Sequence, residues 1–228
     1  MKKQDFLVIL TVLLVLAPFF AFDAVYDTYL KWNNSNPYLL AFVKFAILGT
    51  FGEMLASRIR TGKYYDTEFG LCPKMIVWGL LGMWIALAMK VFAAGVPAVM
   101  EKLFAANGLV DAMQGEFSVM KLAGAFCISV IMNTSFAPVF MTIHKMCDMH
   151  IAQYHGSVKC LAKPVRMADL LSRTNWNTQW NFVFKKTIPL FWIPAHTITF
   201  ILPMAFQVLF AAFLGVVLGL ILAIAAKK

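Results

Sequence analysis

The sequence predicts an all-α, polytopic transmembrane helical bundle with about six spans and one interfacial amphipathic helix. Of the 228 residues, 61% are hydrophobic and only 14% are charged. The mean hydropathy is +0.75. A soluble domain of this size cannot hide so much apolar surface from water. Apolar runs long enough to cross a bilayer recur along the chain, and the charged residues gather between them.

Breaks between the apolar runs define the individual spans. Pro37 and Pro73 lie where helices can begin, and Pro203 separates the last two runs. The first run is interpreted as a retained helix, because Phe22 and Asp23 stand where a small-residue cleavage site would be. A cleaved signal peptide is the alternative. The predicted spans cover residues 6–22, 37–57, 75–97, 122–143, 187–202 and 204–226.

The distribution of basic residues predicts the orientation. With a cytoplasmic N-terminus, 15 of the 20 lysines and arginines fall on the inner side, three on the outer side and two within spans. This bias favours an even number of spans, with both termini in the cytoplasm of a cell inner membrane. We divide the chain into residues 1–35, an N-terminal helix with its outer loop, and residues 36–228, a bundle with a cytoplasmic loop at 144–186.

One segment of that loop is predicted to lie in the membrane interface. The run VRMADLLSRTNWNTQW places Met167, Leu170, Leu171 and Trp176 near one helical face, and Trp180 follows at the edge of the next span. Large apolar side chains on one face with basic residues on the other are typical of interfacial helices.

The sequence contains no signature of catalysis or of cofactor binding. It lacks paired carboxylates within a span, a phosphate loop and a zinc-protease motif, so we expect neither an enzyme nor a bound cofactor. The net charge of +9 is explained by the loops and headgroups rather than by nucleic acid. A metal site built from His144, Cys147 and His150, whose S and N atoms suit zinc or copper, stays open as an alternative.

Polar residues inside the spans are costly, at about 2.5–3.5 kcal/mol for a charge at a helix centre. Lys44, Lys90 and His196 are predicted to lie at similar depth, in the outer third of the membrane. Either the lysines extend to the headgroups while His196 bonds a neighbouring helix, or the three form a cationic ring in a polar lumen that favours anions. The candidate pore-lining or polar intramembrane residues are Lys44, Glu53, Lys90, Asn133 and His196.

A second set of residues is expected to shape helices, because proline frees a carbonyl and bends the helix axis. Pro189 and Pro194 are predicted to bend the fifth span, and Pro203 to make the corner into the sixth. The full set is Phe136, Pro138, Pro189, Trp192, Pro194 and Pro203.

Several of these positions resemble motifs of the twenty-two-kilodalton peroxisomal membrane protein family, which includes Mpv-seventeen. The motifs occur in the family's order from about Asn36 to the end, although the acidic residue before Asn133 is missing. They are Asn36-Pro37, Gly52-Glu53, Gly79-x-x-Gly82, Asn133-x-x-Phe136-x-Pro138, Trp176, Trp192-x-Pro194 and Thr199-Phe200-x-x-Pro203. The resemblance implies a small helical membrane protein that forms pores or affects the permeability of small solutes.

The sequence therefore predicts an integral membrane protein that forms a channel or carrier for small, in particular anionic, solutes. A non-transporting scaffold or assembly factor with basic cytoplasmic loops is one alternative, and a metal-handling membrane protein is another. The expected partners are the lipid bilayer and a small-molecule solute. A homo-oligomer is left open.

Overall fold

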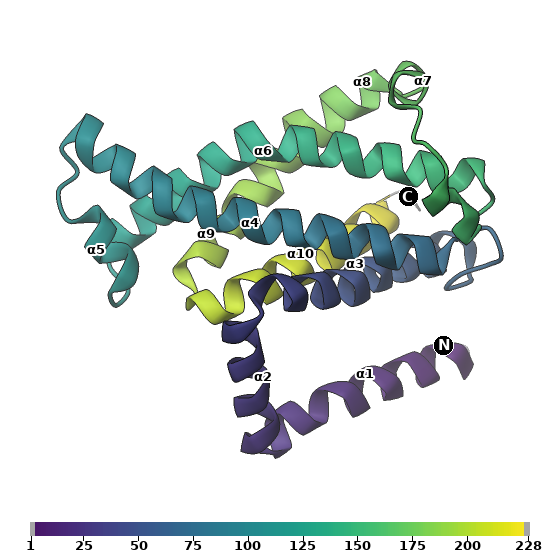
Figure 1. The fold of residues 1–228 in the computed structure, drawn as a ribbon, viewed down its shortest axis with the longest axis horizontal. Coiled ribbons are helices and arrows are strands. Elements are labelled where there is room, and N and C mark those ends of the chain that lie inside the picture. Colours follow the sequence, from purple (N-terminus) through teal and green to yellow (C-terminus); the bar gives the residue numbers. More distant parts are fainter. Residues whose placement is uncertain (1–2, 226–228) are drawn as a thin grey trace. The chain divides into compact units, whose positions relative to one another are not determined.

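The computed structural model describes residues 3–225, and this part of the chain is helical with no strand (Figure 1). The all-α prediction is confirmed. Among the described residues, α1, α3, α4, α6 and α10 are long and apolar enough to cross a membrane. The elements are α1 (Lys3–Ala21), α2 (Asp23–Ser35), α3 (Pro37–Thr61), α4 (Leu71–Phe104), α5 (Leu109–Gln114), α6 (Val119–Gln153), a 3-10 helix η1 (Val158–Ala162), α7 (Met167–Ser172), α8 (Trp176–Thr178), a π-helix η2 (Gln179–Trp192), α9 (Ile193–Ile201) and α10 (Met204–Ala225).

The chain divides into two compact units after Leu40, and the first contains α1, α2 and the first turn of α3. Residues 23–35, predicted as an outer loop, instead form α2, and they contain neither glycine nor proline to interrupt a helix. Asp23 lies in the first turn of α2, where a carboxylate interacts favourably with the helix dipole. Phe19 of α1 meets Tyr29 of α2 edge to face, with ring centroids 5.8 Å apart.

The second unit is organised around α4 and α6, which lie side by side (Figure 1). At about 1.5 Å per residue, these helices of 34 and 35 residues are about 50 Å long, which exceeds the hydrocarbon thickness of about 30 Å. The short helix α5 packs where they are joined, and α9 and η2 pack along α6. The buried core between these elements includes Phe45, Met89, Ile128, Met132 and Phe200.

Aromatic rings lie over glycines where α3 and α4 contact each other. A Cβ atom added to Gly82 would lie 2.4 Å from Cβ of Phe45, and one added to Gly49 would lie 2.5 Å from the ring of Trp78. Small residues let the backbones of two membrane helices approach closely. Close approach stabilises the pair through van der Waals contacts, because lipid is as apolar as the helices and the hydrophobic effect contributes little. The two glycines therefore set the separation of α3 and α4.

Helix α6 continues well past the predicted end of its span. It runs through Pro138 to Gln153, so residues 144–153 belong to a helix and not to the predicted loop at 144–186. In the turn that follows the helix, Gly156 has φ of 70° and lies against Gly70, itself at φ 73°. Both glycines occupy the left-handed region that other residues avoid.

The segment predicted as the fifth span, residues 187–202, belongs up to Ile201 to a longer continuous helix whose first part has π-helical turns. Residues 179–192 form the π-helix η2, and α9 then carries the chain to Ile201. Pro189 lies inside this π-helix, whose wider turn relieves the clash that a proline ring makes with a preceding carbonyl. Leu202 is extended, the conformation favoured before a proline, and α10 begins directly after Pro203.

The predicted interfacial helix is wrong as a single element, because the segment forms the two short helices α7 and α8. Thr174 donates its hydroxyl to the carbonyl of Leu170 at 2.9 Å, and the side chain of Asn175 accepts from the backbone of Thr178 at 3.0 Å. Thr174 thus bonds back to α7, and the next residue, Asn175, caps the start of α8. Trp176 stays exposed, whereas Leu170 is fully buried.

We predict that Gly82→Ala destabilises the protein by about 1–3 kcal/mol, because Cβ of Phe45 is attached to the backbone and cannot rotate away. The matched control is Gly95→Ala in the same helix, where an added Cβ meets no atom within 4 Å. Its effect is expected to be neutral or stabilising by up to about 1 kcal/mol. Unfolding in detergent micelles measures both variants, and equal stabilities would contradict the packing described here.

Candidate solute cavity

A cavity of about 440 Å³ lies within the second unit, with walls from α3, α4, α6, η2, α9 and α10. Small residues on α3 and α10 create it. A Cβ atom on Gly52 would lie 3.0 Å from Cα of Val216, so the two helices nearly touch at that point. The residue before Val216, Gly215, lines the cavity, and a Cβ atom added to it would meet no atom within 4 Å. Helix α10 therefore contacts α3 closely at Val216, whereas the space beside Gly215 is open.

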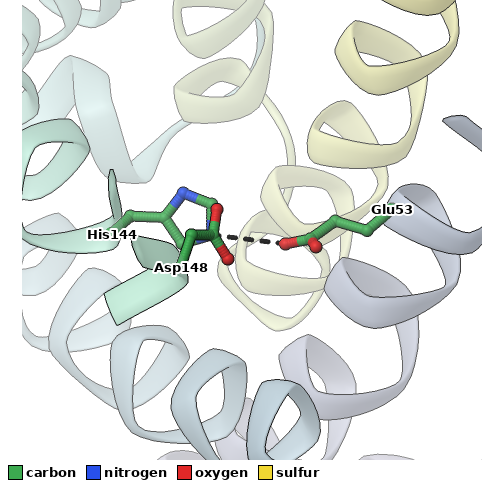
Figure 2. A group of neighbouring side chains, drawn as sticks. All are labelled: Glu53, His144 and Asp148. Carbon is green, nitrogen blue, oxygen red and sulfur yellow. Dashed lines mark ion pairs between the residues drawn. The ribbon is translucent and has the colours of Figure 1, made fainter. Parts of the chain in front are cut away.

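Four ionisable side chains from three helices form what we call the charged cluster: Glu53, Lys74, His144 and Asp148. The ammonium of Lys74 donates to Oε2 of Glu53 and, at 2.7 Å, to Oδ1 of Asp148. His144 lies on the other side of the two acids, with Nε2 at 3.4 Å from Oε1 of Glu53 and 3.7 Å from Oδ2 of Asp148. Figure 2 shows the two acids and the imidazole turned toward one another.

The positions of these residues in their helices explain how the cluster assembles. His144 and Asp148 are four residues apart on α6 and therefore share a face. Lys74 lies in the first turn of α4, and Trp78, one turn later, donates Nε1–H to Oε1 of Glu53 at 2.7 Å. The four charged side chains sum to zero when His144 is protonated and to one negative charge when it is neutral. The cluster therefore ties α3, α4 and α6 together with nearly balanced charge.

Oxygen and nitrogen atoms of Glu53, His144 and Asp148 lie within 4.8 Å of one another, which is close enough to hold a metal ion. The ammonium of Lys74 already lies between the two carboxylates, so the donor set contains its own cation and does not fit a metal. The predicted set of His144, Cys147 and His150 does not converge. At about 100° per residue these positions spread around α6, and Nε2 of His150 lies 3.0 Å from the carbonyl of Cys160.

A second polar group, Ser129, Asn133 and His196, lies between α6 and α9 and is almost completely buried. The Asn133 amide donates to the carbonyl of Ser129 at 2.8 Å, and its Oδ1 is 3.1 Å from Nδ1 of His196. Ser129 donates its hydroxyl to the carbonyl of Ile193 at 2.7 Å. Burial of polar groups requires such partners, and here the partners join the two helices. Asn133 and His196 both line the cavity.

The structure brings three of the five predicted polar residues to one cavity. Glu53, Asn133 and His196 contribute to its walls, together with the predicted helix-shaping residues Phe136 and Trp192. Lys44 and Lys90 do not line it: Lys44 is buried on α3, and Lys90 is exposed on α4. The predicted cationic ring around a lumen is therefore absent from this cavity.

Three residues of the site escaped prediction as site residues: Lys74, Trp78 and Asp148. Lys74 follows Pro73 and reads as an inner-side charge flanking a span, and Asp148 lies beyond the predicted end of the fourth span. A signal was available, because the sequence places Glu53 in the C-terminal half of its helix, and a buried carboxylate requires a cation nearby. Lys74, at the start of the next apolar run, and His144, at the end of a later one, lie at the same predicted end of the bundle.

Comparisons with models of protein families, with curated proteins and with solved structures find no match for this chain. The resemblance to the Mpv-seventeen family therefore stays a prediction from short motifs. Five residues of those motifs lie on the cavity wall: Gly52, Glu53, Asn133, Phe136 and Trp192.

We predict that Lys74→Ala lowers the free energy of unfolding by about 3–5 kcal/mol, because two largely buried carboxylates lose their shared cation. The Lys74 side chain is 13% exposed, and Glu53 and Asp148 are 23% and 31% exposed. The control is Arg173→Ala, which breaks an exposed ion pair with Asp169 and is expected to cost less than about 1 kcal/mol.

Thermal or denaturant unfolding in detergent measures both variants. The triple variant Lys74→Met, Glu53→Gln and Asp148→Asn removes all three charges and is expected to recover much of the lost stability. Equal losses in Lys74→Ala and Arg173→Ala would contradict a structural role for the cluster.

Proposed function

We propose that this protein is a membrane channel or carrier for small solutes and that the cavity in its second unit holds the solute in transit. The observation that carries the proposal is the cavity itself, in a unit built largely of membrane-length helices, with polar side chains contributed by α3, α6 and α9. Polar residues at membrane depth are costly and are typical of solute pathways. A cavity of about 440 Å³ is within the range of small-molecule sites.

Further support comes from the composition of the walls. Aromatic and other apolar side chains dominate, and the few polar groups gather in the charged cluster and around His196. Arg60 and Lys145 also contribute to the walls and are exposed, so two basic side chains join the cavity to the surface of this unit. Because Lys44 and Lys90 lie off the walls, nothing in this proposal depends on a preference for anions.

The proposal includes six spans, with η2 and α9 together forming the fifth. Their combined length, residues 179–201, suffices to cross hydrocarbon at about 1.5 Å per residue. We propose that both termini face the cytoplasm of a cell inner membrane, as the bias of basic residues indicates. Lys2, Lys227 and Lys228, which contribute to that bias, and residue 226 of the last predicted span lie outside the described residues.

The substitution Gly215→Leu tests the proposal, because Gly215 lines the cavity and an added Cβ there meets no atom within 4 Å. We expect solute flux into liposomes to fall at least about tenfold, since an isobutyl group fills part of the space. Gly95→Leu on α4 is the matched control. It also replaces a helical glycine in open space, but it lies outside the cavity wall, and its flux should equal that of the unaltered protein.

Flux is measured with solutes of graded size and charge against empty liposomes, and both variants are first compared for folding in detergent. Flux through Gly215→Leu equal to that through Gly95→Leu would overturn the assignment of the cavity. Flux no greater than in empty liposomes for every protein would favour a non-transporting scaffold.

A further inference from the structure

We propose that the cavity binds a neutral, largely apolar molecule through a hydroxyl group that donates a hydrogen bond to Nε2 of His196. This inference names the class of solute and rests on the proposed function of the cavity. It begins from the orientation of a single buried side chain amide.

The amide of Asn133 can face only one way. Its nitrogen lies 2.8 Å from the carbonyl oxygen of Ser129 and 3.2 Å from the Ser129 hydroxyl, and a carbonyl only accepts. The NH₂ group therefore points to Ser129, and Oδ1 points to His196. Reversing the amide would set two oxygens against each other.

This orientation determines the tautomer of His196. Because Oδ1 of Asn133 can only accept, Nδ1 of His196, 3.1 Å away, must carry the hydrogen. In the neutral imidazole the second nitrogen, Nε2, then has a free lone pair and is an acceptor. Among the described residues Nε2 has no hydrogen-bond partner, and His196 lines the cavity.

The surroundings of His196 keep its ring neutral. The side chain is 8% exposed, and the groups in contact with it are the Asn133 amide from α6 and the ring of Trp192 from η2, at 5.2 Å between centroids. Neither carries a charge. A buried cation without a carboxylate partner is strongly disfavoured, and the nearest acids in the cavity, Glu53 and Asp148, are engaged by Lys74.

A free acceptor in an apolar cavity selects among ligand classes. A deprotonated anionic group has no hydrogen to donate to a lone pair, and either an anion or an ammonium group would bring an unpaired charge to this neutral, buried place. A hydroxyl group donates its hydrogen and stays neutral. Its oxygen also supplies an acceptor beside Trp192, whose Nε1–H is buried without a partner.

The remaining walls match the body of such a molecule. Aromatic surface comes from Phe45, Trp78, Phe136 and Phe140, and Met132 adds a flexible apolar side chain. An aromatic or isoprenoid-like hydrocarbon with one hydroxyl group buries its apolar part against these side chains while the hydroxyl meets His196.

The test compares 1-naphthol with 1-methoxynaphthalene, which has nearly the same shape but no hydrogen to donate. Equilibrium dialysis against purified protein in nanodiscs measures both, with Gly215→Leu as the blocked-site control that removes partition into lipid. We expect 1-naphthol to bind about three- to tenfold more tightly than the ether. Equal affinities, or no binding above the Gly215→Leu control, would overturn the proposal.

Two variants test whether the preference for 1-naphthol over its ether depends on Nε2 of His196 or on Nε1 of Trp192. In His196→Ala the ratio of affinities between 1-naphthol and its ether should fall to about one. In Trp192→Phe, which keeps a ring but removes the N–H, the ratio should persist. Loss of the ratio in Trp192→Phe with its retention in His196→Ala would overturn the assignment. The comparison of ligands on the unaltered protein stands even where His196→Ala fails to fold.

The outcome separates this inference from the proposed function. If Gly215→Leu blocks flux of other solutes but 1-naphthol shows no preference over its ether, the transport role stands and the solute class is wrong. If the preference holds but Gly215→Leu leaves flux unchanged, the cavity is a binding site and the transport role is wrong.

Discussion

The ion pairs of Lys74 with two carboxylates are the interaction on which the second unit depends. Glu53 lies on α3, Lys74 on α4 and Asp148 on α6, so one ammonium group joins the three helices. In a bilayer the apolar surfaces of helices gain little by leaving lipid for one another. A shared cation between two partly buried acids provides what apolar contact cannot, because separating the helices would leave opposite charges unpaired in a low-dielectric medium.

Glycine contributes in two opposite ways to the same unit. At Gly49 and Gly82 the missing side chain is replaced by an aromatic ring of the neighbouring helix, so α3 and α4 pack closely. At Gly215 nothing replaces it, and the space remains open. The charged cluster and the close contacts hold the helices at fixed separation, which keeps the helices from collapsing into the open space. The cavity is thus a consequence of packing constraints beside it.

Much of the helical class and part of the site could be predicted from the sequence, for physical reasons that differ between residues. Apolar length predicts membrane helices, and Pro203 ends α9 because proline restricts the residue before it. Glu53, Asn133 and His196 stand out because polar groups inside apolar runs need partners. The partners themselves depend on the tertiary arrangement. Lys74 looks like an ordinary flanking charge until α3 and α6 bring two acids to it.

Other differences arise where local chemistry competes with the pattern of hydrophobicity. Helix α6 continues past its apolar run because residues 144–153 lack glycine and proline and find partners in the charged cluster and in the carbonyl of Cys160. The segment before α9 adopts wide π turns, which a periodicity of 3.6 residues does not anticipate. The cationic ring, one of the two alternatives that the sequence left open, is not found at this cavity, because similar depth does not imply a shared face: Lys44 and Lys90 lie off the wall that His196 lines.

The two polar groups of the cavity differ in a way that bears on how a solute is held. In the charged cluster, Lys74 and Trp78 occupy the oxygens of Glu53, and Lys74 also reaches Asp148. The two carboxylates therefore offer a ligand little unless it displaces these contacts, although Nε2 of His144 is buried without a hydrogen-bond partner among the described residues. His196 differs because its amide partner uses only one ring nitrogen and leaves the other without a partner. Because His196 lines the cavity, a ligand there can pair with this free acceptor without displacing an internal contact. The solute class proposed above follows from this difference between the two groups.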